Sequence, residues 1–172
     1  CGPSSLAMVL KYLGKNVSPI DTARFALGCT GVMEMKTVQS NWSKSPWSDL
    51  KLEALYGSSQ AETALSIAAQ GHPIIFNCHP CVGYTGNDKL KTYPGHYMVI
   101  TGSSDGGKTF TINDPGGNPA INNAIVKMTR DQILEPQQYQ AETGCQLAKD
   151  SSDCLNKLDK IRKPPPFYYI HK

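Results

Sequence analysis

CGPSSLAMVLKYLG, residues 1–14, is the stretch from which the fold of this chain is best predicted. Its apolar residues recur at helical spacing, Pro3 suits the first turn of a helix, and Gly14 is typical of the position just beyond a helix end. Cys1 would begin this helix, where the positive end of the helix dipole favours a thiolate and lowers the pKa of a cysteine. The stretch therefore indicates an activated nucleophile, although cysteine is also a common structural core residue.

More helices are expected in the first half of the chain, because capping residues precede apolar runs. Ser18, Pro19 and Asp21 open one of them. The expected helices cover residues 18–28, 48–56 and 59–69, the last opened by a capping box at Ser59. Residues 29–47 lack periodicity and are expected to form a long connection that Trp42 and Trp47 anchor in the core.

The pattern changes near residue 73 to short apolar runs separated by turn residues. Strands are expected at residues 73–78, 96–102, 108–114, 124–128 and 167–170, with one short helix from residue 129 to Pro136. The predicted fold class is therefore α+β, with an N-terminal helical half that carries the cysteine packed on a C-terminal antiparallel sheet.

One predicted hairpin brings two polar residues together. His96 begins the first strand, residues 103–107 (SSDGG) form the turn, and Asp114 follows the second strand. In an antiparallel pair the start of one strand lies beside the end of the next, so these side chains are expected to be neighbours. An aspartate that accepts from one imidazole nitrogen orients the other toward a thiol, as in cysteine hydrolases. Taken singly, each residue is better explained as a strand-end or turn residue.

Length and charge restrict the class of protein. The chain has 172 residues, of which 40% are hydrophobic, and we expect a single domain over residues 1–172. The net charge of +3 comes from scattered residues, so no nucleic-acid partner is indicated. No apolar run reaches the ~18 residues that a membrane span needs.

The chain has six cysteines, which suggests an oxidising environment and an extracytoplasmic or secreted protein. With Cys1 kept as a free thiol, we expect the disulfides Cys78–Cys81 and Cys145–Cys154, the second within an exposed helical insertion at residues 137–163. A redox motif or half of a zinc site remains an alternative for residues 78–81.

Three motifs, at residues 1–8 (CGPSSLAM), 95–102 (GHYMVITG) and 112–115 (INDP), together carry a family resemblance. In this order they resemble bacterial papain-like cysteine peptidases of the bacteriocin-leader-processing, or double-glycine peptidase-like, type. The resemblance implies a papain-like fold in which Cys1 is the nucleophile, His96 the general base and acid, and Asp114 the orienting residue. The implied activity is hydrolysis of a peptide or isopeptide bond through an acyl-enzyme, without metal or organic cofactor.

The sequence departs from the family at the oxyanion hole. A glutamine a few residues before the cysteine supplies one N–H donor in the family, whereas this chain begins at Cys1. We therefore expect one of two explanations. Either the chain is processed, and its upstream segment is a partner beside a peptide or protein substrate, or the oxyanion hole uses other donors, such as the backbone N–H groups near Cys1 and Gly2.

The sequence also leaves other functions open. The acyl group could pass to an amine, as in papain-like transpeptidases that use a similar cysteine helix. An N-terminal-nucleophile hydrolase is disfavoured, because such enzymes place the nucleophile at the start of a strand. A disulfide-stabilised binding module without catalysis is the alternative from another class, and the reactivity of the Cys1 thiol at pH ~6 separates it from the hydrolase.

Overall fold

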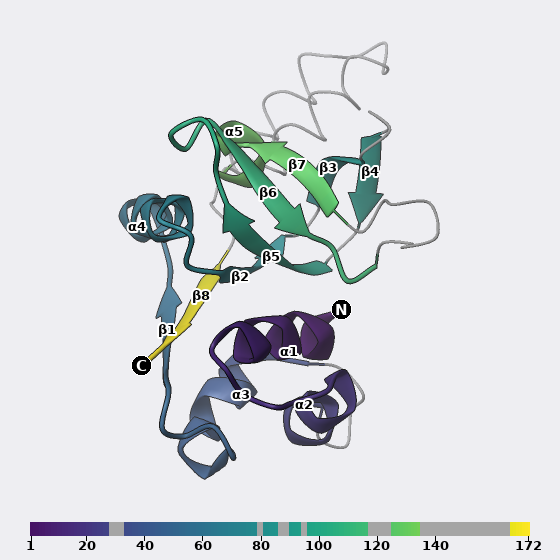
Figure 1. The fold of residues 1–172 in the computed structure, drawn as a ribbon, viewed down its shortest axis with the longest axis vertical. Helices are drawn as coiled ribbons and strands as arrows, with labels where there is room; N and C mark the ends of the chain where they lie inside the picture. Colours follow the sequence, from purple (N-terminus) through teal and green to yellow (C-terminus); the bar gives the residue numbers. More distant parts are fainter. Residues whose placement is uncertain (28–32, 79–80, 86–89, 94–95, 117–124, 135–165) are drawn as a thin grey trace, which may run out of the picture.

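The computed structural model describes residues 1–27, 33–78, 81–85, 90–93, 96–116, 125–134 and 166–172 (Figure 1). The predicted insertion at residues 137–163 and the expected pair Cys145–Cys154 lie outside these residues. No helix among the described residues has both the length and the apolar character required to cross a bilayer.

The described residues form five α-helices, one 3-10 helix and eight strands. The helices are α1 (Gly2–Tyr12), α2 (Pro19–Ala26), α3 (Met35–Ser40), the 3-10 helix η1 (Trp42–Lys44), α4 (Ser58–Ala69) and α5 (Arg130–Leu134). The strands are β1 (Lys51–Leu55), β2 (Ile74–Cys78), β3 (Cys81–Thr85), β4 (Leu90–Tyr93), β5 (His96–Gly102), β6 (Thr109–Asn113), β7 (Ile125–Thr129) and β8 (Phe167–His171).

The strands form a single eight-stranded sheet in the order β1-β8-β2-β5-β6-β7-β3-β4, and neighbouring strands run antiparallel. Figure 1 shows α1, α2 and α3 together on one side of the sheet and α4 apart from them. The predicted α+β class, with the cysteine helix packed on an antiparallel sheet, is confirmed.

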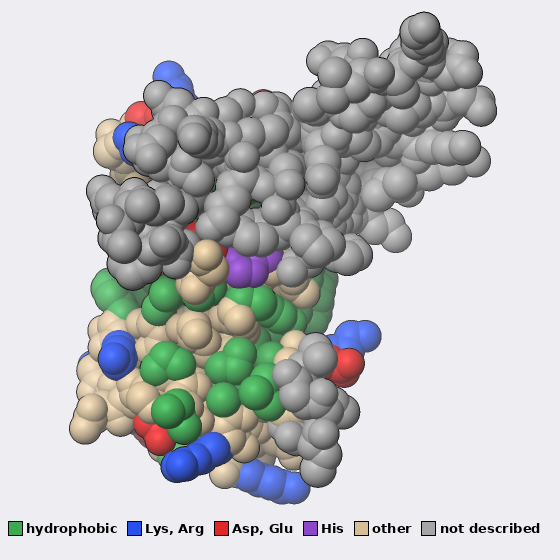
Figure 2. All heavy atoms as spheres, turned by 90° about the vertical axis from the view of Figure 1, so that its right-hand side faces the viewer, with side chains coloured by type: hydrophobic (Ala, Val, Ile, Leu, Met, Phe, Trp, Pro, Cys, Tyr) green, Lys and Arg blue, Asp and Glu red, His purple; other side chains and the backbone are tan. Residues whose placement is uncertain are grey.

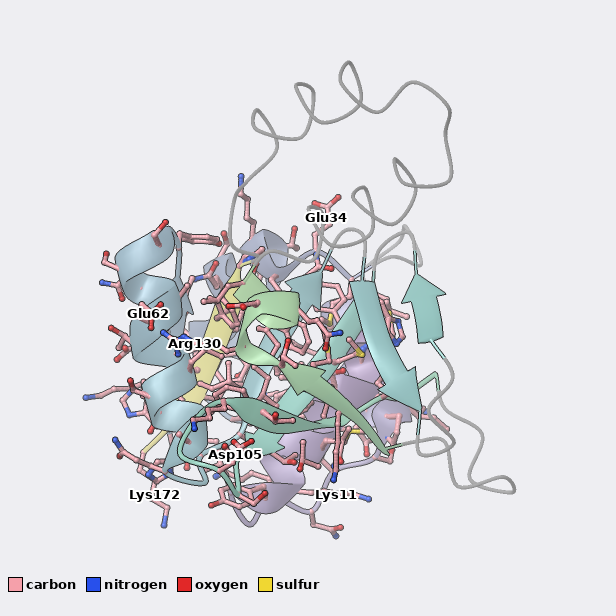
Figure 3. The ribbon with its side chains drawn as sticks, turned by 90° about the horizontal axis from the view of Figure 1, so that it is seen from above. Lys11, Glu34, Glu62, Asp105, Arg130 and Lys172 are labelled. Atoms are coloured by element: carbon pink, nitrogen blue, oxygen red, sulfur yellow. The ribbon has the colours of Figure 1, made fainter. Side chains whose placement is uncertain are left out.

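The sheet has an apolar core on each face because strand side chains alternate between the faces. On β5, Val99 belongs to the core shared with α1, and Met98 and Ile100 belong to the core shared with α4. Figure 3 shows Arg130 of α5 beside Glu62 of α4, and the two side chains form an ion pair. Helices thus cover the central strands from both sides.

The first two helices form as predicted. Gly14 has φ of 84°, a left-handed conformation that favours glycine, directly after the end of α1. At the start of α2, the Asp21 carboxylate accepts from the Ser18 N–H at 2.8 Å, and the Asp21 N–H donates to the Ser18 hydroxyl at 3.3 Å. This is the capping box expected from the sequence.

Three local predictions were wrong. Residues 48–56 do not form a helix: they contain β1, whose exposed Lys51 and Glu53 alternate with half-buried residues and whose backbone pairs with β8. α4 is capped by the backbone at Gly57, and no capping box forms at Ser59. Residues 29–47 contain α3 and η1 within the expected connection. In the first case long-range strand pairing overrides local helix propensity.

The prediction for the two tryptophans is confirmed. Trp42 is 8% exposed and Trp47 is 6% exposed, and the Trp42 indole N–H donates to the Leu50 carbonyl at 2.7 Å. Phe25 packs edge-on against both rings. These aromatic residues hold η1 against the core beneath α1 and α2.

Candidate active site

The structure brings His96 and Asp114 together at one end of the β5–β6 hairpin. His96 is the first residue of β5, and Asp114 directly follows β6. The His96 Nε2 atom lies 2.6 Å from the Asp114 Oδ1 atom, and the two side chains are 8% and 0% exposed. The juxtaposition predicted from the hairpin is therefore present, as a short and almost completely buried hydrogen bond.

This pair defines the protonation pattern of the imidazole. An ionised carboxylate can only accept, so the nitrogen that faces it must carry a proton. In the neutral ring the proton is therefore on Nε2 and the lone pair is on Nδ1. Nδ1 is consequently the atom with which His96 can accept a proton from a nucleophile.

Cys1 is a free, exposed cysteine at the N-cap of α1, and its side chain makes no capping hydrogen bond. Helix α1 packs against β5. Figure 1 shows the N-terminal end of α1 below the end of the sheet where β5 begins and β6 finishes. The structure thus places the helix start that carries the cysteine at the same end of the molecule as the His96–Asp114 pair.

Hydrogen bonds fix the position of Cys1 relative to β5. The Ser5 N–H donates to the Cys1 carbonyl at 2.9 Å, which places Ser5 one helical turn after Cys1. The buried Ser5 hydroxyl donates to the Tyr97 carbonyl at 3.1 Å. Since Tyr97 follows His96 directly, this bond ties the first turn of α1 to the strand that begins with the histidine.

The first turn of α1 also contacts α2 and Met33. The Thr22 hydroxyl, which is fully buried on α2, donates to the Pro3 carbonyl at 2.7 Å. Gly2 lies so close to Met33 that a Cβ atom at position 2 would come within 2.9 Å of the Met33 Cβ atom. These contacts leave little freedom for the backbone that carries Cys1.

The residue after His96 is a tyrosine that remains neutral. Burial raises the pKa of Tyr97 above its ordinary value, and a hydrogen bond from the Met35 backbone opposes the rise only in part. Burial also raises the pKa of Tyr168, and a hydrogen bond with Tyr56 adds to the effect. The hydroxyl groups of Tyr97 and Tyr168 are therefore neutral at pH ~7.

The other histidines have different surroundings. His171 on β8 forms an exposed pair with Glu53 of β1, with 2.8 Å between Nε2 and Oε1. Sequence reasoning missed this pair because residues 48–56 were expected to be helical. The His72 ring lies 6.3 Å from the Tyr169 ring, and His79 lies outside the described residues.

The disulfide and zinc hypotheses lie outside what the structure describes. Cys78 ends β2 and Cys81 begins β3, but their side chains, like Cys29, are not among the described groups. Within the described part of the chain, no cluster of three or more His, Cys, Asp or Glu side chains is arranged to hold a metal ion. Cys78–Cys81 therefore remains a prediction.

On the face that carries the N-terminal end of α1, Figure 2 shows hydrophobic side chains gathered over the helical part, with a histidine side chain next to them.

Two comparisons with known proteins give matches. A model of the family described as "Peptidase_C39 like family" matches residues 1–148. No curated protein matches the chain. Among solved structures, the Pseudomonas avirulence protein AvrPphB is similar at 13% sequence identity, over 99% of this chain and 89% of that chain, with a TM-score of 0.34. A TM-score of this size supports no conclusion about the present chain.

Proposed function

Because this chain belongs to the Peptidase_C39 like family and is therefore a cysteine peptidase, we propose that Cys1, His96 and Asp114 form its catalytic triad. Cys1 is the nucleophile, His96 is the general base and acid, and Asp114 orients the imidazole. The substrate is a peptide or protein whose peptide or isopeptide bond is cleaved.

The observation that carries this proposal is the buried His96–Asp114 hydrogen bond of 2.6 Å at the strand end next to the cysteine helix. A buried carboxylate without a donor would be costly, and here the imidazole N–H supplies one. By contrast, the His171 and Glu53 side chains of the surface pair are 24% and 53% exposed, and α1 contacts β5 more extensively than it contacts β8. Burial and position therefore distinguish the proposed catalytic pair from the surface pair.

The proposed reaction follows from these groups. His96 Nδ1 takes the thiol proton, and the Cys1 sulfur forms a bond with the carbonyl carbon of the substrate. The carbon–nitrogen bond then breaks, and the imidazolium gives its proton to the departing amine. Water, deprotonated by the same nitrogen, adds to the thioester carbon, the carbon–sulfur bond breaks to release the acid, and the imidazolium returns its proton to the Cys1 sulfur. Asp114 stabilises the imidazolium in both halves of the cycle.

The oxyanion of each tetrahedral intermediate requires N–H donors. The backbone N–H groups at the start of α1, near Cys1 and Gly2, are the donors we propose. They lie at the positive end of a helix of 11 residues, which favours developing negative charge.

Thiol reactivity tests the proposal. The Cys1 thiol should react with iodoacetamide at pH ~6, where an ordinary thiol of pKa ~8.5 is almost entirely protonated. His96→Ala should slow this labelling about tenfold or more, because the imidazolium no longer stabilises the thiolate. Peptide mapping by mass spectrometry identifies the labelled cysteine.

The matched control is His171→Ala, which removes a histidine that also pairs with a carboxylate but lies on β8. This variant should label Cys1 at the wild-type rate. Equal rates in wild type and His96→Ala would refute the triad. Cleavage of a mixed peptide library, abolished in Cys1→Ala, tests the peptidase reaction directly.

A further inference from the structure

The Asp114 carboxylate is held by a second donor besides the imidazole. The Gly116 N–H donates to the same Oδ1 atom at 2.7 Å, which closes an Asx turn over Pro115. Oδ1 therefore accepts from His96 Nε2 on one side and from the backbone on the other. The orientation of residue 114 is fixed by the backbone and not by the histidine alone.

Gly116 also lies against the imidazole ring. A Cβ atom built at this position would be 3.3 Å from His96 Cε1, 3.4 Å from His96 Nε2 and 3.2 Å from Asp114 Oδ1. Distances this short are tighter than those of ordinary Cβ contacts, so a side chain here would displace the ring or the carboxylate. Glycine permits the turn to approach both members of the pair closely.

These two contacts have a consequence for the polarity of the site. If residue 114 were an asparagine, its amide could present either the oxygen or the NH2 group toward His96. The NH2 group at the Oδ1 position would face the Gly116 N–H at 2.7 Å, donor against donor. The oxygen would instead accept from both N–H groups, and the ring proton would stay on Nε2.

We propose that Gly116 is a positioning residue, whose N–H fixes which atom of residue 114 faces His96 and whose missing side chain sets the place of the imidazole. The proposal rests on the proposed triad for its catalytic meaning. It assigns two separate tasks: the Gly116 N–H keeps an acceptor atom of residue 114 facing His96 Nε2 even where that residue carries no charge, and the charge of Asp114 stabilises the imidazolium.

The tautomer can be measured without any substrate. In protein labelled with ¹⁵N-histidine, two-bond ¹⁵N–¹H spectra above the titration range show which ring nitrogen carries the proton. The chain has four histidines, so the His96 signals are identified by their loss in His96→Gln. We expect the proton on Nε2 in wild type and again on Nε2 in Asp114→Asn. A proton on Nδ1 in folded Asp114→Asn would overturn the proposal.

The place of the ring is tested by Gly116→Ala, with Gly102→Ala as the matched control. Gly102 ends β5 in the same hairpin, and a Cβ there would meet no atom within 4 Å. Gly116→Ala should slow iodoacetamide labelling of Cys1 at pH ~6 about tenfold, since small displacements of paired groups are costly. Gly102→Ala should label at the wild-type rate, and an unchanged rate in Gly116→Ala would overturn the positional role.

The two measurements separate failure of this proposal from failure of the proposed function. If His96→Ala labels Cys1 as fast as wild type, the triad is refuted, whatever the spectra show. If His96→Ala labels slowly but Asp114→Asn carries its proton on Nδ1, the triad stands and the role of Gly116 is refuted. Thermal unfolding of each variant confirms that the spectra report folded protein.

Discussion

Gly2→Ala tests how tightly the backbone next to Cys1 is held. Gly2 is the first residue of α1 and is buried against Met33. A Cβ atom at position 2 would be 2.7 Å from the Met33 methyl carbon, 2.9 Å from its sulfur and 2.9 Å from its Cβ atom. The methyl end of the methionine can rotate away, but its Cβ atom can move only with the backbone. Either the start of α1 or the segment at Met33 must therefore shift.

The expected size follows from two opposing contributions. Overpacking a tight contact costs about 1–3 kcal/mol. Alanine is preferred to glycine within a helix by up to about 1 kcal/mol, and by less at the first position. The balance is a destabilisation of about 1–2 kcal/mol. For a domain of this size, each kcal/mol lowers Tm by about 2–4 °C.

Thermal unfolding followed by circular dichroism measures this effect, and Gly102→Ala is the control because its Cβ would meet no atom within 4 Å. The double variant Gly2→Ala/Met33→Ala should be more stable than the sum of the single changes predicts, since removal of the methionine side chain makes room for the new methyl group. Iodoacetamide labelling of Cys1 should slow in Gly2→Ala, because the helix start moves. A Tm equal to or above that of wild type would refute the close packing of Gly2.

Two further predictions concern stability. Thr22→Val keeps the shape of a fully buried side chain but removes its 2.7 Å hydrogen bond to the Pro3 carbonyl, so it should lower the free energy of unfolding by about 1 kcal/mol in chemical denaturation. The control Thr63→Val removes an exposed helix hydrogen bond and should lower it by less than about 0.5 kcal/mol. Equal losses in the two variants would contradict the role of Thr22. Burial raises the pKa values of Tyr97 and Tyr168 above the ordinary tyrosine value of 10.0, so the stability that these neutral hydroxyls contribute is complete below pH 10.0 and is lost as the pH rises above it. The double variant Tyr97→Phe/Tyr168→Phe should therefore lose less stability than wild type between pH 9 and pH 11 (about one unit either side of the ordinary tyrosine value), and parallel losses would contradict the assignment.

The parts of the fold that the sequence predicted correctly depend on neighbouring residues. Ser18 and Asp21 form their capping box within one helical turn, and Gly14 ends α1 with a local change of φ. His96 and Asp114 meet because a tight turn joins their strands, so the hairpin pattern alone predicts the pair. Each of these features requires only short-range information.

The parts that were missed depend on residues far apart in the chain. β1 forms because β8, more than a hundred residues later, offers it a backbone partner, and Glu53 consequently reaches His171 across 118 positions. No local pattern distinguishes residues 48–56 from a helix in the absence of that partner. The role of Gly116 was missed for a different reason: it depends on the distance between a backbone N–H and a side-chain oxygen, which a sequence motif does not contain.

The same long-range pairing supports the candidate site. β8 lies between β1 and β2, and β2 pairs with β5 over its whole length, from Ile74 opposite Ile100 to Cys78 opposite His96. The strand that begins with His96 is therefore held by β2 on one side and β6 on the other, while Ser5 joins it to the cysteine helix. Because β8 covers the outer edge of β2, residues 167–171 help to hold the strand pair to which His96 belongs. The candidate site thus depends on β8 as well, although its three proposed catalytic residues lie within positions 1–114.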